Sequence, residues 1–163
     1  MADIFISYTK EDCERVEPLA KALENQGWSI FWDFTIPVGK TWRQVITDAF
    51  ETARLVIVAW SKTSVDSHWV QEQADRGLER NILFPILIDN VRPPMGFGAI
   101  KAADLINWDP TQSSPEFEKL IADISAILGP SPIEVKEAEQ KRAEEERRRK
   151  QVKKASRRGT KKG

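Results

Sequence analysis

Arg54-Leu55-Val56-Ile57-Val58-Ala59-Trp60-Ser61 contains an unbroken apolar run from Leu55 to Trp60. A run without alternating polar residues is typical of a β-strand that is buried on both faces. Such strands lie in the middle of parallel sheets, because helices cover both faces of those sheets. The stretch therefore predicts an α/β fold built on a parallel sheet.

On either side of this stretch, short apolar runs alternate with amphipathic segments of helical period. This alternation favours right-handed β-α-β units. We therefore expect a flavodoxin-like fold, with a five-stranded parallel sheet, helices on both faces and a charged C-terminal helix. The other expected strands are 4–6, 28–32, 82–88 and 104–108, and the expected helices are 13–23, 45–53, 69–78 and 117–128.

Two prolines conflict with this pattern. Pro18 lies inside the first helical segment, where a proline costs about 3 kcal/mol, so we expect a kink there or a helix that begins near Glu17. Pro85 lies inside a predicted strand. Because proline cannot donate a hydrogen bond to a neighbouring strand, it indicates an edge position or a bulge.

The composition limits the chemistry and the setting of the chain. Its one cysteine, Cys13, excludes an internal disulfide framework, and its one histidine, His68, leaves no metal-ligand spacing. No apolar run approaches the roughly 18 residues that a membrane span needs, and the N-terminus has no secretory pattern. We expect a soluble cytoplasmic protein with one domain, 1–130, and a charged tail, 131–163.

Formal neutrality hides two regions of opposite charge. Residues 1–132 hold 12 basic and 19 acidic side chains, a net charge of −7, whereas residues 133–163 hold 13 basic and 6 acidic ones, a net charge of +7. The few apolar residues of the tail form no stripe, which predicts a solvated helix with a disordered basic end. We interpret the tail first as a solvated linker, and second as a ligand for nucleic acid or an acidic surface.

The segment Ser67-His68-Trp69-Val70-Gln71-Glu72-Gln73 places a tryptophan and a glutamine one helical turn apart. At 100° per residue, Glu72 points away from the core stripe, which consists of Val70, Ala74, Gly77 and Leu78. Gln73 falls on the edge of that stripe, so we expect it to be a rim residue beside Trp69. His68 is expected at the helix surface, without a catalytic role.

In sheets of this kind, ligands bind beyond the carboxyl ends of the strands, here at 7–10, 33–42 and 60–64. No glycine-rich turn follows the first strand, which excludes the dinucleotide fingerprint and the phosphate loop of an NTPase. The third strand ends in Trp60-Ser61 rather than in an aspartate, which excludes a phospho-acceptor receiver domain.

Five segments occur in a fixed order: DIFISYTKED (3–12), GWSIFWD (27–33), FTIPVGKTW (34–42), RLVIVAWS (54–61) and SHWVQEQ (67–73). Together they resemble a Toll/interleukin receptor (TIR) domain over residues 1–130, of the bacterial type and the NAD-hydrolase branch. Members of this family either scaffold signalling through TIR–TIR contacts or hydrolyse NAD. The hydrolytic members carry a Glu four residues after the Trp of the last segment, and here that position is Gln73.

The resemblance implies both a substrate site and an assembly surface. Gln73 occupies the catalytic position, and the implied substrate contacts are Tyr8, Thr9, Lys10, Asp33, Lys40, Trp42 and Trp69. A loop of one copy would complete the pocket of the next, through Phe34, Ile36, Pro37, Val38 and Gly39. Head-to-tail contacts of this kind produce open filaments when the rotation does not close.

The resemblance further implies immune, antiphage defence in which NAD is a substrate, not a cofactor, and yields nicotinamide and linear or cyclic ADP-ribose. An amide at position 73 brings no negative charge to an oxocarbenium-like state, so we expect this chain to be inactive or impaired. It is then either a substituted form of an enzyme or a non-catalytic TIR–TIR interaction module. Trp42 and Trp69 have structural alternatives, as does Lys40, which could simply be solvated.

The expected partners follow from the same resemblance. They are NAD, further copies of the chain, and a sensor or effector protein connected through the tail. No metal and no membrane partner are expected, and nucleic acid ranks below the interpretation of the tail as a solvated linker.

Overall fold

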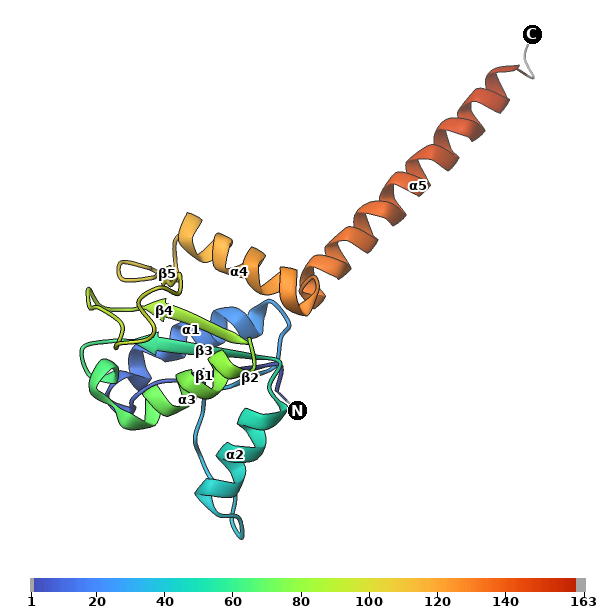
Figure 1. Cartoon of the computed structure of the whole chain (residues 1–163). Coiled ribbons are helices and arrows are strands. Elements are labelled where there is room, and N and C mark those ends of the chain that lie inside the picture. The colour runs from blue at the N-terminus through green and yellow to red at the C-terminus, as the bar shows by residue number, and fades with distance from the viewer. Residues whose placement is uncertain (1, 161–163) are drawn as a thin grey trace.

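The computed structural model describes residues 2–160 and has the expected α/β architecture (Figure 1). Five parallel strands form one sheet in the order β2-β1-β3-β4-β5. The strands are β1 (Ile4–Ser7), β2 (Ile30–Phe31), β3 (Leu55–Trp60), β4 (Leu83–Leu87) and β5 (Ala103–Asp104). The helices are α1 (Cys13–Asn25), α2 (Trp42–Thr52), α3 (His68–Glu79), α4 (Pro115–Leu128) and α5 (Pro132–Thr160), with 3-10 turns at Lys10–Asp12 and Ser64–Asp66.

Strand β3 is the centre of the sheet, as its sequence predicts. Every residue of β3 is fully buried, and β3 pairs with β1 on one side and β4 on the other. Apolar residues of α1 and α4 cover one face of the sheet, and those of α2 and α3 cover the other. Burial of each large apolar side chain in these two clusters contributes about 1.5–3 kcal/mol.

The two outer strands are shorter than the sequence predicts. Strand β2 spans two residues rather than 28–32, although Trp28 is buried just before it. Strand β5 ends at Asp104 rather than extending to Trp108. The Asp104 carboxylate accepts a hydrogen bond from the Ile106 backbone N–H at 3.1 Å, which turns the chain out of the sheet.

Helix α1 passes through Pro18, so the expected start near Glu17 is wrong. Val16 and Leu19, on either side of the proline, are buried in the core, and this packing offsets the cost of about 3 kcal/mol. The proline deprives the carbonyl of Glu14 of its helical partner. Because Glu14 is exposed, water can supply the missing hydrogen bond.

Pro85 lies in β4, which is neither an edge strand nor bulged, so both expectations for it are wrong. The register with β3 is continuous from Leu83 to Leu87. The Ile82 carbonyl accepts a hydrogen bond from the Val56 N–H, and the Ile88 N–H donates one to the Trp60 carbonyl. The even-numbered residues of β4 therefore form their backbone hydrogen bonds with β3. The backbone N and C=O of Pro85 therefore point away from β3, toward the side of β5. Because β5 pairs only with Ile86 and Leu87, no strand residue lies opposite Pro85 there. Its missing N–H costs no hydrogen bond of the sheet.

Helix α5 begins against the end of α1 and then leaves the domain (Figure 1). The Ile133 N–H donates to the Gln26 carbonyl at 3.3 Å, and Ser131 is fully buried. From residue 132 to 155 every residue is exposed. The helix continues to Thr160. The predicted disordered end is not tested, and residues 161–163 lie outside the described part. The division into 1–130 and 131–163 stays a prediction.

In residues 2–160, no helix combines the length and the apolar character required to cross a bilayer. The longest helix, α5, is rich in charged residues.

Gly27 provides a test of how α5 is attached. Its φ is +100°, and an added Cβ would lie 2.8 Å from Cβ of Pro132. Gly129 has a similar φ of +89° but open space around it. We expect Gly129→Ala to lower the free energy of unfolding by the backbone cost alone, about 1–3 kcal/mol. Gly27→Ala should cost more, because it also displaces Pro132. Equal losses in chemical denaturation would show that Pro132 does not pack there.

Candidate functional site

A cavity of about 560 Å³ lies beyond the carboxyl ends of β1 and β2, where the sheet topology predicts a ligand site. We call it the β1-side cavity. It brings together six of the seven predicted substrate contacts: Tyr8, Thr9, Lys10, Asp33, Trp42 and Trp69. The seventh, Lys40, is exposed and does not line it. The roles of these residues stay predictions.

Tyr8 and Asp33 hold the walls of this cavity in place. The Tyr8 hydroxyl donates to the backbone carbonyl of Trp32, and its ring stacks on Phe34 at a centroid distance of 5.1 Å. Burial, followed by the contact with Cys13, raises the pKa of Tyr8 above its ordinary value, so the hydroxyl stays protonated. Asp33 accepts a hydrogen bond from the N–H of Thr35 at 3.1 Å, which holds the start of the following loop.

Gln73 is buried rather than at a rim, with an exposed fraction of 5%. Its Oε1 atom accepts a hydrogen bond from the Ser7 hydroxyl at the end of β1. This bond satisfies a polar side chain on the core side of α3. Leu78, expected in the core stripe, is instead 39% exposed. The buried face of α3 is therefore rotated relative to the prediction, toward Gln73.

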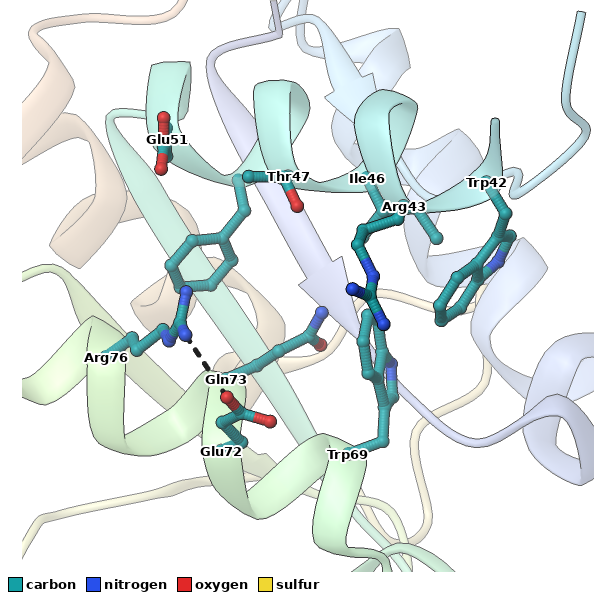
Figure 2. Close-up of a pocket in the computed structure, with 10 residues that line it drawn as sticks. Trp42, Arg43, Ile46, Thr47, Glu51, Trp69, Glu72, Gln73 and Arg76 are labelled. Atoms are coloured by element: carbon teal, nitrogen blue, oxygen red, sulfur yellow. Dashed lines mark hydrogen bonds and ion pairs between the residues drawn. The ribbon is translucent and has the colours of Figure 1, made fainter. Parts of the chain in front are cut away.

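Gln73 lines a second cavity, of about 530 Å³, between α2 and α3 (Figure 2). We call it the α2–α3 cavity. Figure 2 shows the Gln73 amide reaching into it, with the nitrogen on the α2 side. In residues 2–160, no hydrogen bond from this nitrogen is present, so it can donate to a ligand. The site thus presents a donor where the resemblance implies a carboxylate.

The charges around the α2–α3 cavity lie at its mouth. Glu72 is exposed, as predicted, and its Oε1 is 3.2 Å from Nη2 of Arg76. Arg43 and Glu51 are also exposed and come from α2. Glu72 therefore lines the mouth of the cavity as part of an exposed ion pair.

Trp42 and Trp69 line both cavities and are the only residues that do so. Their ring centroids are 4.8 Å apart, with an interplanar angle of 37°. Trp42 is 49% exposed and begins α2, directly after the loop 34–42. The structure therefore places the predicted catalytic position on one side of this pair and most of the predicted substrate contacts on the other.

The predicted assembly loop is the most open part of the site. Between Phe34 and Thr41 it has no regular secondary structure apart from a turn, in which the Lys40 N–H donates to the Pro37 carbonyl at 3.2 Å. Gly39 has a φ of +87°, which favours glycine. Val38 is fully exposed, whereas Phe34 and Ile36 are half-buried. An apolar side chain at the tip of an exposed loop is available to a neighbouring molecule.

Sequence reasoning missed a polar network beneath the β1-side cavity. Asp12, which is 3% exposed, accepts from Thr9 Oγ1 at 2.7 Å and from the Ser61 hydroxyl. Arg15 links Asp12 to Asp89, with Nη2 2.7 Å from Asp89 Oδ1. The network joins the segments that follow β1, β3 and β4. Asp89 comes just after the predicted strand 82–88. Its place at the carboxyl end of a strand was the only feature of the sequence that could have indicated the network.

In the described residues, no group of three or more His, Cys, Asp or Glu side chains could hold a metal ion. His68 is exposed, as predicted, and lines neither cavity.

Asp89 makes stability depend on pH. Hydrogen bonds from Arg15 and then from the Lys62 N–H hold the pKa of Asp89 below its ordinary value. A lowered native pKa stabilises the fold above about pH 4, and this contribution is lost as pH falls through the native pKa. We expect Asp89→Asn to be less stable than the parent at pH 7, with the difference shrinking below about pH 4. Thermal unfolding across pH measures this.

The control is Asp75→Asn, which removes an exposed carboxylate from α3. Its unfolding curve should follow that of the parent chain at every pH. A gap between Asp89→Asn and the parent that stays constant from neutral to acid pH would contradict the role of the Arg15–Asp89 pair.

Comparisons with known proteins bear on this site. Residues 4–121 match the family model for the TIR domain. The TIR domain of the Toll-related receptor TRR-2 from Hydra magnipapillata is 25% identical, with a TM-score of 0.64 over 76% of this chain and 98% of that one. The TIR domains of the activated Roq1 resistosome, which recognises the effector XopQ, are 22% identical, with a TM-score of 0.58 over 76% and 99%.

A metazoan TIR-STING receptor from C. gigas, in complex with 2′,3′-cGAMP, is 23% identical, with a TM-score of 0.55 over 64% of this chain and 35% of that one. At identities under 25%, this receptor and the resistosome show only that the fold is shared. A comparison with curated proteins gave no match.

Proposed function

The chain belongs to the TIR domain family, and we propose that it binds NAD in the β1-side cavity, with the nicotinamide riboside directed toward position 73. With Glu at this position, the domain would hydrolyse NAD to nicotinamide and linear or cyclic ADP-ribose. The main support is Gln73 itself, which is buried, oriented by Ser7 and in contact with a cavity beside Trp69. Its amide lies where a carboxylate would face a ligand.

The chemistry explains why Gln73 matters most. Cleavage of the nicotinamide–ribose bond develops positive charge on the sugar, as in glycoside hydrolysis, and an adjacent carboxylate stabilises it. The Gln73 amide can donate a hydrogen bond to a ribose hydroxyl but carries no charge. Loss of one preorganised electrostatic group typically lowers the rate by about 10²–10³. We propose that this chain binds NAD with impaired turnover.

Self-assembly is the second part of the proposal. A dinucleotide reaching from Thr9 and Lys10 to Gln73 requires Trp42 and Trp69 to separate. Trp42 is the last residue of the loop 34–42, whose tip is exposed, so docking of this loop on another copy would pull Trp42 away and join the two cavities. Such head-to-tail contacts repeat along a filament. We assign the assembly to immune defence of the bacterial, antiphage kind, inside the cytoplasm.

A non-catalytic TIR–TIR interaction module is the alternative function. Two observations favour it: the missing charge at position 73, and the exposed Val38 at the tip of the loop. In this alternative, the loop would dock on a further copy or on the TIR domain of a sensor or effector, and the two cavities would bind no substrate.

Restoring the carboxylate separates the two functions. We expect Gln73→Glu to release nicotinamide from NAD at least about 10²-fold faster than the parent chain, because it supplies the missing charge. Gln44→Glu, on the exposed surface of α2, adds the same charge outside both cavities and should have no effect. Chromatography of the products measures release. If Gln73→Glu stays inert under crowding and forced assembly, the enzyme proposal is wrong.

Lys40 tests whether the loop completes a neighbour's site. Because Lys40 lines neither cavity of its own copy, we expect Lys40→Glu to weaken NAD binding only when the protein is assembled. Calorimetry below and above the assembly concentration measures this. Lys119→Glu on α4, which also lines neither cavity, is the control. Unchanged affinity for Lys40→Glu in the assembled state would remove Lys40 from the substrate site.

A further inference from the structure

The charge of helix α5 is divided into two blocks. Residues 132–146 hold six acidic and three basic side chains. From residue 147 onward there is no acidic residue. Six of the eight residues from 147 to 154 are basic, and we call this segment the basic block: Arg147, Arg148, Arg149, Lys150, Lys153 and Lys154.

The basic block is exposed and helical, rather than a disordered end. Every residue from 147 to 154 is exposed, and α5 continues beyond them to Thr160. Arg149, Lys150, Lys153 and Lys154 are spaced i, i+1, i+4 and i+5, so they share one face of the helix. The one ion pair recorded in this block, from Lys150 to Glu146, is loose at 3.9 Å, and both side chains are more than 70% exposed. The cations are therefore free to bind.

The first half of α5 separates the basic block from the acidic domain. Fifteen residues of helix span about 22 Å, more than twice the Debye length of about 8 Å at physiological salt. Because α5 projects away from the sheet (Figure 1), the block is beyond the reach of the domain's negative charge. The domain then neither neutralises the block nor repels an anionic partner that binds there.

The density of charge identifies the partner. The basic block carries six charges along about 12 Å of helix axis, or one per about 2 Å. Double-stranded DNA carries one negative charge per about 1.7 Å of its axis, and its major groove, about 12 Å wide, admits an α-helix. The acidic domain of another copy is a poorer match, because its 19 acidic side chains are interspersed with 12 basic ones.

Two other anionic partners fit the helix less well. Residues 132–160 contain no aromatic side chain on which the bases of a single strand could stack. They also form no apolar stripe that could enter a bilayer beside anionic headgroups. We propose that the basic block binds the phosphate backbone of double-stranded nucleic acid, without sequence preference. This proposal does not depend on NAD binding.

The test uses the full chain and fluorescently labelled 24-base-pair duplexes of mixed sequence, one of DNA and one of RNA. Fluorescence anisotropy gives the affinity from 50 to 200 mM salt. If all six cations engage, the plot of log affinity against log salt has a slope of about −5. The block variant Lys150/Lys153/Lys154→Gln should lower affinity at least tenfold and halve the slope, to about −3, because three of the six contacts are lost.

Two further variants make the result specific. Lys136/Lys141/Arg142→Gln removes three charges from the first half of α5 and should change affinity less than about twofold. Lys150/Lys153/Lys154→Arg keeps the charge and should retain binding. The proposal is supported if either duplex binds and the variants change its affinity as stated. The duplex with the higher affinity identifies the preferred nucleic acid. No binding at 50 mM salt, or equal losses in both Gln variants, would overturn it. So would block-dependent binding to phosphatidylserine vesicles or to a second copy, without duplex binding.

Discussion

The burial of β3 on both faces is the constraint on which the rest of the structure depends. A strand with no exposed residue requires helices on both sides, and its parallel pairing with β1 fixes where β1 ends. Ser7 is the last residue of β1, and its hydroxyl meets Gln73 on α3. Because most buried polar groups in proteins are hydrogen-bonded, this contact joins the sheet and α3 at that point. The candidate site is therefore a consequence of how the central strands are packed.

Position 73 combines a structural and a chemical role. The Gln73 oxygen satisfies Ser7, while its nitrogen faces the α2–α3 cavity. The Trp42–Trp69 pair stands between this amide and the predicted substrate contacts on the β1 side. Under the proposed function, the parts of the NAD site lie in two compartments. The loop that leads into Trp42 is also the loop available to another copy, so assembly and substrate access would be controlled by the same segment.

The fold could be predicted because its signals are local. Apolar runs and helical spacing identified the sheet, β3 and the helices, and polar residues after β1 and β2 identified the β1-side cavity. Tertiary contacts decided what was missed. Helical geometry placed Gln73 at a rim and Leu78 in the core, but the Ser7 hydroxyl makes burial of Gln73 favourable. The link from Arg15 to Asp89 spans 74 positions in the chain, beyond any local pattern. The charged C-terminal helix was predicted, but solvated charge patterns do not fix the residue at which such a helix ends.

The central claim is that NAD occupies a joined cavity with its nicotinamide riboside at position 73. The most direct measurement is an experimental structure of the assembled chain with NAD bound. The account predicts that Trp42 and Trp69 are separated, that the Gln73 amide nitrogen donates to the ribose, and that the loop 34–42 of a neighbouring copy borders the ligand. An assembled structure in which the Trp42–Trp69 pair is intact and NAD is absent from both cavities would contradict it.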